Sequence, residues 1–247
     1  EADLMDKAQV DAAIRAEPLD GILHCASKAL VAESVAKPMF YFRQNITGAT
    51  HLIDAALSAG NIPIVFSSSA AVYGEPQTVP IAEEAPKQPI NPYGFTKLAI
   101  EKALDAVSTA HGLQSCSLRY FNAAGADPQG RVGERHTPES HLIPNIINAA
   151  LEGHTETFTI FGNDYPTRDG TCLRDFIHTL DIARGHAQAF NHLWDGGKTT
   201  AINLGSGNGQ TVKEVFTAAQ LCFEKEKVRF VLIYFGVRMV NAQPPEG

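Results

Sequence analysis

The stretch Ile62-Pro-Ile-Val-Phe-Ser-Ser68 decides the fold prediction for this chain. It is a short apolar run bounded by proline and serine, a pattern typical of a strand that is buried on both faces of a sheet. Two similar runs flank it, Leu19-Asp-Gly-Ile-Leu-His-Cys-Ala26 and Gln114-Ser-Cys-Ser-Leu-Arg-Tyr-Phe121. Segments with apolar residues at helical spacing lie between these runs, at 46–57 and 98–107. This alternation of strand and helix predicts an α/β fold with a doubly wound parallel sheet.

The sequence changes character after Asn122. Residues 123–171 are rich in Gly, Pro, Asp and His, with one helical pattern at 141–151 and one short strand pattern at 157–161. We interpret this part as a smaller lobe attached to the sheet.

The alternation of strands and helices returns near the end of the chain. A strand is predicted at 176–178, a helix at 180–192 and another strand at 200–204. A further helix opens at Thr211, with Glu214 three residues later, which is the pattern of a capping box.

These patterns predict two domains, each built from two stretches of chain. The first is a Rossmann-like sheet domain that is incomplete at its amino-terminal side. The second is a smaller lobe. The expected boundaries are 1–122 and 173–205 for the first domain, and 123–172 and 206–247 for the second.

The composition excludes several classes of protein. With 44% hydrophobic residues among 247, the chain can bury a sizeable core, so we exclude a disordered, collagen-like or coiled-coil chain. The net charge of −7 and the scattered basic residues exclude a nucleic-acid partner. The most apolar stretch, 230–237, is far shorter than the roughly 20 residues of a membrane-spanning helix, so no membrane partner is expected.

The cysteines and the first residues indicate a compartment. Cys25, Cys116, Cys172 and Cys222 lie far apart and form no C-x-x-C pair, which favours free thiols over disulfides. The first six residues are acidic, unlike the basic start of a secretory signal peptide. We expect a cytoplasmic protein.

The glycine-rich loop Gly205-Ser-Gly-Asn-Gly209 follows a predicted strand and precedes a predicted helix. This position suggests the G-x-G-x-x-G fingerprint of dinucleotide sites, but Gln210 stands where the third glycine would be. We therefore interpret the loop as a tight turn between strand and helix.

Tyr93-Gly-Phe-Thr-Lys97 is the most informative short segment for chemistry. Residues four apart project from one helix face, and a lysine ammonium favours the anionic form of a neighbouring tyrosine, which can then act as a general base. This spacing alone is common on solvated helix faces. Ser67-Ser-Ser69 adds three hydroxyls at the carboxyl end of a predicted strand, where open α/β sheets bind ligands. Together these segments indicate a Ser/Tyr/Lys triad of the short-chain dehydrogenase type.

The chain resembles the UDP-glucose 4-epimerases of the extended short-chain dehydrogenase/reductase family, from about Asp3 to about Cys222. Sister dehydratases carry Thr-Asp-Glu where this chain has Ser69-Ala-Ala71, which argues against dehydration. The motifs that carry the resemblance are His24 to Ala26, Glu33-Ser34, Asn45 to Gly48, Ser67 to Gly74, Pro92 to Lys97, Leu118 to Asn122, Ile160 to Pro166, Asp169 to Thr171, Arg174 to His178 and Asn203 to Gly207.

The resemblance implies an isomerase that uses tightly held NAD, with the sheet domain as the NAD-binding domain and the smaller lobe as the substrate-binding lobe for a UDP-sugar. In the family, NAD takes a hydride from C4 of the sugar, and the 4-keto sugar turns over and receives the hydride on its other face. The implied substrates are UDP-glucose and UDP-galactose, and the implied assembly is a homodimer. By the resemblance, Tyr93 is the acid and base at the 4-hydroxyl, Ser69 hydrogen-bonds the same oxygen, and Lys97 holds the nicotinamide ribose and lowers the pKa of Tyr93.

Two sets of binding residues are also implied by the resemblance. The cofactor set is Asp3, Leu4, Cys25, Ala26, Ser27, Lys28, Ala29, Asn45, Ser67, Ser69, Tyr93, Lys97 and Phe121. The substrate set is Ser69, Tyr93, Asn122, His141, Leu142, Phe161 and Arg174, the last suited to bidentate phosphate binding. Simpler interpretations stay open for Asp3 as a solvated residue and for Phe121 and Phe161 as core aromatics.

No metal site is expected. Glu134, His136, Glu139 and His141 are ligand types, but they lack the H-E-x-x-H spacing on a helix and fall in a Gly/Pro-rich segment.

The sequence also departs from the family. The amino-terminal glycine-rich unit that binds the NAD pyrophosphate is absent, and the sequence after about Cys222 no longer follows the family pattern. Two alternatives therefore stay open: a non-catalytic remnant that binds UDP-sugars or a partner, and another NAD-dependent sugar-nucleotide epimerase.

Overall fold

The structure is a computed structural model that describes residues 1–134, 136–137, 139–151, 158–224 and 232–235. The chain folds into two compact units. Unit 1 comprises Glu1–Phe121 and Asp181–Leu204, and unit 2 comprises Asn122–Leu180 and Gly205–Gly247.

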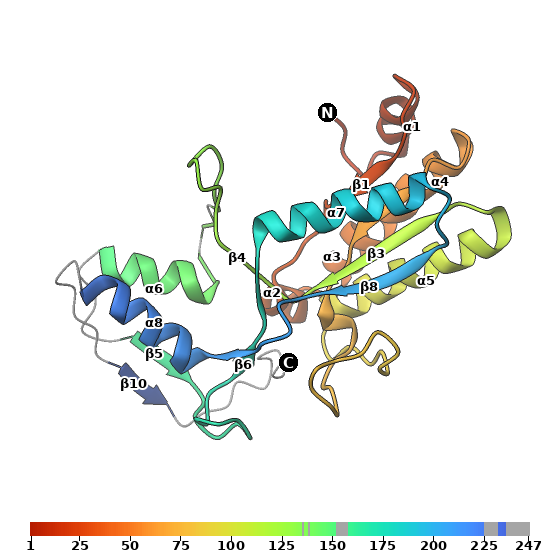
Figure 1. Cartoon of the computed structure of the whole chain (residues 1–247). Coiled ribbons are helices and arrows are strands. Elements are labelled where there is room, and N and C mark those ends of the chain that lie inside the picture. The colour runs from red at the N-terminus through yellow and green to blue at the C-terminus, as the bar shows by residue number, and fades with distance from the viewer. Residues whose placement is uncertain (135, 138, 152–157, 225–231, 236–247) are drawn as a thin grey trace. The chain divides into compact units, whose positions relative to one another are not determined.

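Unit 1 is built on a four-stranded parallel sheet, as predicted (Figure 1). The strand order is β1-β2-β3-β8, with β1 at Ile22–His24, β2 at Ile64–Ser67, β3 at Ser115–Tyr120 and β8 at Thr200–Leu204. Val65 of β2 is in register with Leu23 on one side and Cys116 on the other. Every residue of β2 is buried, which confirms the prediction of a strand covered on both faces.

Helices cover both faces of this sheet. The flanking helices are α1 (Lys7–Arg15), α4 (Gly48–Ser58), α5 (Pro92–His111) and α7 (Thr179–Trp194). Ile64 and Phe66 of β2 pack in one core with α1, α4 and α5, whereas Val65 packs with α7 on the other side. Figure 1 shows α5 and α7 on opposite sides of β3 and β8. Because successive strand residues point to opposite faces, this is the doubly wound arrangement that the sequence predicts.

Shorter elements connect these helices and strands: α2 (Val31–Ala36), α3 (Pro38–Tyr41), the π-helix η1 (Phe42–Thr47) and the 3-10 turn η2 (Ala70–Val72). A π-turn is rare and often marks a functional site, and η1 contains Asn45.

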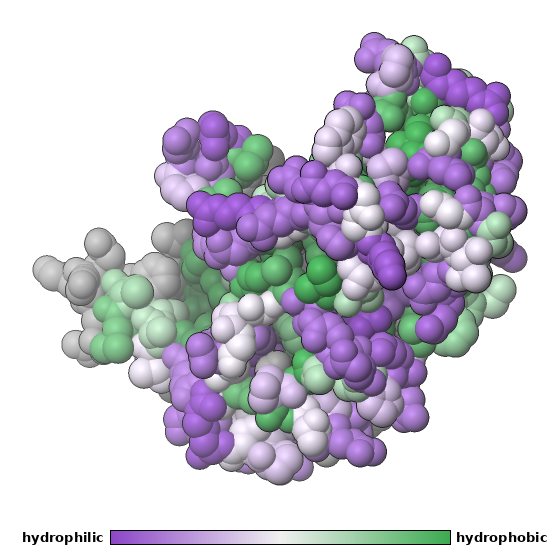
Figure 2. Space-filling model, turned by 45° about the vertical axis from the view of Figure 1, so that its right-hand side comes forward, coloured by the Kyte–Doolittle hydropathy of each residue, from purple (hydrophilic) through white to green (hydrophobic). Residues whose placement is uncertain are grey.

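β1 is an end strand of the sheet, and its Leu23 is 55% exposed. Figure 2 shows other apolar residues among hydrophilic ones on the face that it draws.

Among its described residues, unit 2 contains three two-stranded sheets and two helices. β4 (Asn122–Ala124) pairs in parallel with β7 (Phe176–His178), β5 (Phe158–Phe161) in parallel with β10 (Leu232–Phe235), and β6 (Leu173–Arg174) antiparallel with β9 (Gln210–Thr211). The helices are α6 (Leu142–Leu151) and α8 (Val212–Glu224). The predicted capping box at α8 is confirmed, because the Glu214 N–H donates to the Thr211 hydroxyl (3.2 Å) and the Thr211 N–H donates to the Glu214 carboxylate (2.9 Å).

Residues 173–180 lie in a different unit from the one that the sequence analysis gave them. They cluster with unit 2, because β7 pairs with β4 and β6 pairs with β9 rather than with the four-stranded sheet. The segment after Cys222 lies outside the described residues, apart from the end of α8 and β10. Within the described ranges, no helix combines the length and the apolar character that crossing a bilayer requires.

Candidate active site

The start of α5 holds Tyr93 and Lys97 in place. The Asn91 side chain caps the helix by accepting a hydrogen bond from the Gly94 N–H (2.8 Å), and Pro92 occupies the first helical position. Tyr93 and Lys97 are both buried, and Lys97 Nζ lies 5.6 Å from the centre of the Tyr93 ring. The structure therefore brings these two predicted catalytic side chains together.

Ser69 lies beside this helix, just after β2. Ala71 of η2 packs in one cluster with Tyr93. A Cβ atom at Gly94 would lie 2.5 Å from the Ala71 carbonyl oxygen, so only glycine allows α5 and η2 to approach this closely. The Ser69 hydroxyl accepts a hydrogen bond from the Ala71 N–H (3.1 Å) and so caps η2. Gly94 thus helps to form the site, although the sequence analysis gave it no role. The sequence feature that could have indicated this role is a glycine inside the first turn of a helix.

Lys97 is held at the carboxyl edge of the sheet. Its ammonium donates to the Ser67 carbonyl oxygen (2.8 Å) and to the Ser27 hydroxyl (2.8 Å), so it links the ends of β2 and β1. The residue is 2% exposed, and this burial lowers the pKa of Lys97 to about 7. Lys97 can therefore change its charge near neutral pH, a property typical of functional lysines.

Asn45 ties the loop after β1 to α5. Its side-chain oxygen accepts from the Lys28 N–H (2.8 Å), and its side-chain nitrogen donates to the Lys28 carbonyl oxygen (3.0 Å) and to the Thr96 hydroxyl (3.0 Å). The Thr96 hydroxyl in turn donates to the Tyr93 carbonyl oxygen (2.7 Å). Asn45 is buried, and it positions the loop at 25–29 against the helix that carries Tyr93.

The other predicted cofactor residues fall into two groups. Cys25–Ala29 and Phe121 follow the carboxyl ends of β1 and β3, at the same edge of the parallel sheet as the end of β2. Asp3 and Leu4 lie instead beside α4, where a ring nitrogen of His51 is 2.8 Å from the Leu4 carbonyl oxygen.

The predicted substrate residues of unit 2 are spread over four elements. Asn122 begins β4, His141 and Leu142 lie at the start of α6, Phe161 ends β5 and Arg174 ends β6. The backbone and side-chain amides of Asn122 both donate to the Asp175 carbonyl oxygen (3.0 and 3.2 Å), next to Arg174. Phe161 is 54% exposed, so it is not a core aromatic.

Four potential metal ligands converge before α6. Donor atoms of Glu134, His136, Glu139 and His141 lie within 4.8 Å of one another. Glu134 lies 2.8 Å from His136 and 2.7 Å from His141, and Glu139 lies 2.9 Å from His141. Polar contacts between these carboxylates and imidazoles account for their closeness, and we assign no metal to them.

The glycine-rich loop at 205–209 binds a carboxylate of the chain itself. The buried Asp175 carboxylate accepts hydrogen bonds from the Ser206 N–H (2.8 Å), the Ser206 hydroxyl (2.6 Å) and the Gly207 N–H (2.9 Å). A phosphate-binding loop would present such N–H groups to its ligand. Their engagement with Asp175 agrees with the interpretation of this loop as a turn.

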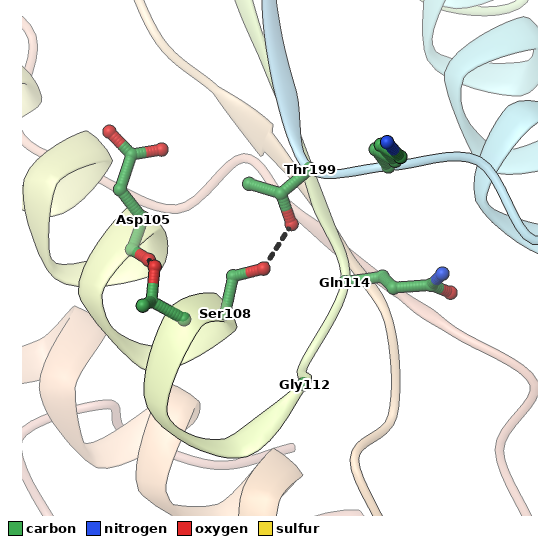
Figure 3. A pocket seen from close by; sticks show the side chains of 7 residues that line it. Asp105, Ser108, Gly112, Gln114 and Thr199 are labelled. Carbon is green, nitrogen blue, oxygen red and sulfur yellow. Dashed lines mark hydrogen bonds between the residues drawn. The ribbon is translucent and has the colours of Figure 1, made fainter.

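A pocket of unit 1 lies at the opposite edge of the sheet (Figure 3). Gln114 and Thr199 in its lining directly precede β3 and β8, and the Thr199 hydroxyl lies 2.8 Å from that of Ser108. Open α/β sheets bind ligands at the carboxyl ends of their strands. We therefore place the candidate site at the edge that carries Tyr93 and Lys97.

Sequence reasoning missed three long-range contacts of this site. The Ser67 hydroxyl lies 2.7 Å from His186 Nε2 and 3.2 Å from Cys25 Sγ. The Ser68 hydroxyl donates to the Glu101 carboxylate (2.5 Å), so the middle serine of the run has a structural partner. His186 is 119 residues from Ser67 in the sequence, and no local sequence pattern marks His186 or Glu101 as a partner of these serines.

His24, next to the site, makes the fold sensitive to acid. It is 4% exposed and stacks on Phe66 at 5.4 Å, and its Nε2 has no hydrogen-bond partner among the described residues. Burial, assisted by the charge of Lys97, lowers the pKa of His24 to about 4. As the pH falls from about 6.5 to about 4, the unfolded chain gains a proton that the folded chain excludes, so stability is present above this window and is lost within it.

We expect His24→Phe to remove much of the loss of stability between pH 6.5 and 4. The lowered pKa of His24 puts this loss at up to about 3 kcal/mol. Melting temperatures of the native chain and of His24→Phe between pH 7.5 and 4 measure the effect, with the exposed His111→Gln as the matched control. Parallel pH curves for the native chain and His24→Phe would contradict this account.

Comparison with known proteins settles the family. The model of the NAD dependent epimerase/dehydratase family matches residues 1–205. The chain belongs to this family. It is 49% identical over 213 residues to a UDP-glucose 4-epimerase of Halalkalibacterium halodurans, covering 86% of this chain and 64% of that protein. Thus this epimerase/dehydratase chain spans just under two thirds of the length of that curated relative.

Solved members of the family have the same fold. The UDP-glucose 4-epimerase of Brucella ovis, in complex with NAD, has a TM-score of 0.90 and 39% identity, covering 99% of this chain and 74% of that one. The UDP-glucose 4-epimerase of Bifidobacterium longum, in complex with NAD+ and UDP, has a TM-score of 0.88 and 33% identity, covering 99% and 72%. These similarities confirm the Rossmann-like α/β fold that the sequence predicts.

Proposed function

We propose that this chain carries UDP-glucose 4-epimerase activity, the NAD-dependent interconversion of UDP-glucose and UDP-galactose. The observation that carries the proposal is the placement of Ser69, Tyr93 and Lys97 around the start of α5, at the carboxyl edge of the sheet. The 49% identity to the Halalkalibacterium epimerase supports the same reaction.

The groups at this edge fit a dinucleotide ribose. Lys97 and Ser27 offer an ammonium and a hydroxyl that lie 2.8 Å apart, and ribose hydroxyls bind such donors and acceptors. The loop at 25–29 is largely exposed. Around this pair, the cofactor set of the proposal is Asp3, Leu4, Cys25, Ala26, Lys28, Ala29, Asn45, Ser67 and Phe121.

NAD, when bound beside Lys97 and Ser27, would supply the acceptor and donor of the hydride at C4 of the sugar. Tyr93 takes the proton of the 4-hydroxyl in one half of the reaction and gives it back in the other. Ser69 donates a hydrogen bond to the same oxygen. Lys97 in its charged form stabilises the phenolate of Tyr93, and its lowered pKa allows it to pass a proton on near neutral pH.

In this proposal, unit 1 holds the cofactor and unit 2 carries the UDP-sugar shell. That shell consists of Asn122, His141, Leu142, Phe161 and Arg174, and the Arg174 guanidinium suits a diphosphate. The proposal includes a cytoplasmic location and a homodimer. Size-exclusion chromatography coupled to light scattering measures the mass of the assembly and so tests the homodimer.

The test is conversion of UDP-galactose to UDP-glucose by the purified chain with added NAD. A parallel sample is denatured, and the supernatant is assayed for NAD and NADH by enzymatic cycling. Turnover that depends on NAD, or about one nucleotide released per chain, supports the proposal. No turnover at high enzyme concentration, together with no bound nucleotide, rejects the activity for this chain.

A further inference from the structure

A thiol, a hydroxyl and an imidazole form a chain of contacts at the carboxyl edge of the sheet. Cys25 follows β1 and is exposed. Its Sγ lies 3.2 Å from the hydroxyl of Ser67 at the end of β2. That hydroxyl lies 2.7 Å from Nε2 of His186, which is buried on α7. Three separate elements therefore converge on one thiol.

The backbone of α7 fixes the tautomer of His186. Its Nδ1 lies 2.8 Å from the Ile182 carbonyl oxygen, which can only accept a hydrogen bond, so Nδ1 carries a proton. In the neutral ring, Nε2 is then the basic nitrogen, and it faces the Ser67 hydroxyl. A proton can move from Cys25 through Ser67 to His186, which leaves a thiolate that accepts a hydrogen bond from Ser67.

The surrounding groups favour this charged form. The interaction with His186 lowers the pKa of Cys25 the most; partial burial opposes this effect, and Ser67 and Lys97 act in the same direction as His186. The same pairing with Cys25 raises the pKa of His186. Among the groups that face the cluster, Lys97 comes from α5, and Tyr120 of β3 has its ring 6.3 Å from that of His186.

The other cysteines provide comparisons within the chain. Cys116 is buried, and this burial raises the pKa of its thiol to about 11. Cys172 is buried as well. Cys222 is exposed on α8 and serves as an internal reference for an accessible thiol.

We propose that Cys25 is a reactive thiol, activated by His186 through Ser67, and a site of covalent modification by soft carbon electrophiles. With a haloacetamide, the Sγ–C bond forms as the C–I bond breaks, iodide leaves with the bonding electron pair, and the thiol proton passes through Ser67 and His186 to solvent. The group added to Sγ then occupies the carboxyl end of β1, next to Ser27 and Lys97. An effect of this added group on cofactor binding rests on the proposed function. The reactivity of Cys25 itself does not depend on that function.

The experiment is labelling of the full chain with iodoacetamide between pH 6 and 9.5, followed by digestion and mass spectrometry. The rates for the Cys25 and Cys222 peptides come from the same samples. At pH 7 we expect Cys25 to react about tenfold faster than Cys222, with the midpoint of its labelling profile at a lower pH. Equal or slower labelling of Cys25 at pH 7, or coincident profiles, would overturn the proposal without the use of any variant.

His186→Gln tests the activation step, and His192→Gln, which replaces an exposed histidine on the same helix, is its matched control. We expect His186→Gln to slow Cys25 labelling about fivefold or more at pH 7, with rates that converge at pH 9.5, where the thiol ionises without help. A loss that persists unchanged at pH 9.5 would mean a structural effect and would contradict activation by His186.

Added NAD separates this proposal from the proposed function. Slower labelling of Cys25 with NAD, and unchanged labelling of Cys222, supports both. Fast labelling that NAD does not affect leaves the reactive thiol standing and counts against the cofactor site. Slow labelling of Cys25 without NAD rejects the reactive thiol, whatever NAD does to the chain.

Discussion

Tyr93→Phe should lower kcat for the conversion of UDP-galactose by about 10²- to 10⁴-fold, the usual contribution of a general acid and base. The change removes one phenol oxygen from a ring that is 8% exposed and packed against Ala71, so the fold keeps its packing while the proton-transfer group is lost. Initial rates with added NAD give kcat and KM. We expect the effect in kcat rather than in KM, because the phenol acts on the reacting oxygen rather than on the nucleotide.

Tyr41→Phe is the matched control for this experiment. Tyr41 packs in the same cluster as Tyr93, but its hydroxyl lies within hydrogen-bond distance of two acceptors away from the proposed chemistry, the Leu30 carbonyl oxygen (2.8 Å) and the Glu33 carboxylate (3.1 Å). The kcat of the Tyr41→Phe chain should stay within a few-fold of the native value. A Tyr93→Phe chain that retains most of its kcat, or a Tyr41→Phe chain that loses as much, would refute the role of Tyr93.

Features that depend on neighbours in the sequence could be predicted. The strand at Ile64–Ser67 shows in its apolar run, α5 in its helical apolar spacing at 98–107, and the closeness of Tyr93 and Lys97 in their spacing on one helix. The capping box at Thr211 is likewise local. Each of these patterns reflects the geometry of a single element, which the sequence encodes directly.

Local sequence patterns do not show which strand another strand pairs with, or which residue a buried polar group contacts. The strand at Phe176–His178 was predicted, but its hydrophobic pattern does not say that it pairs with β4 instead of the main sheet. Similarly, Arg119 inside the apolar strand β3 signals that a buried counter-charge must exist, because an unpaired buried guanidinium costs several kcal/mol. Its partner, Glu101, lies on a helix where many acidic positions would look alike.

Glu101→Ala should destabilise unit 1 by about 3–5 kcal/mol, the usual cost of leaving one member of a buried ion pair without its partner. The Glu101 carboxylate accepts hydrogen bonds from Arg119 Nε (2.9 Å) and Nη2 (2.7 Å), with side-chain exposures of 4% and 6%. It also accepts from Ser68 (2.5 Å), so the change loosens the segment between β2 and Ser69. Urea unfolding followed by the fluorescence of Trp194, the single tryptophan of the chain and a residue of unit 1, measures the free energy of unfolding.

Two further variants show whether the buried charge is the cause. Asp105→Ala, on the same helix, breaks an exposed pair with Lys102 (3.6 Å) and should change the free energy of unfolding by less than about 1 kcal/mol. Glu101→Leu combined with Arg119→Met removes both charges and should be less destabilised than Glu101→Ala, because no uncompensated charge stays in the core. If the double variant is as unstable as Glu101→Ala, the cost comes from lost hydrogen bonds rather than from the Arg119 charge: that of Ser68 to Glu101 in both variants, and in the double variant also that of Arg119 Nη1 to the Tyr73 hydroxyl (2.8 Å). The network would then stabilise unit 1 through its hydrogen bonds rather than through its ion pair.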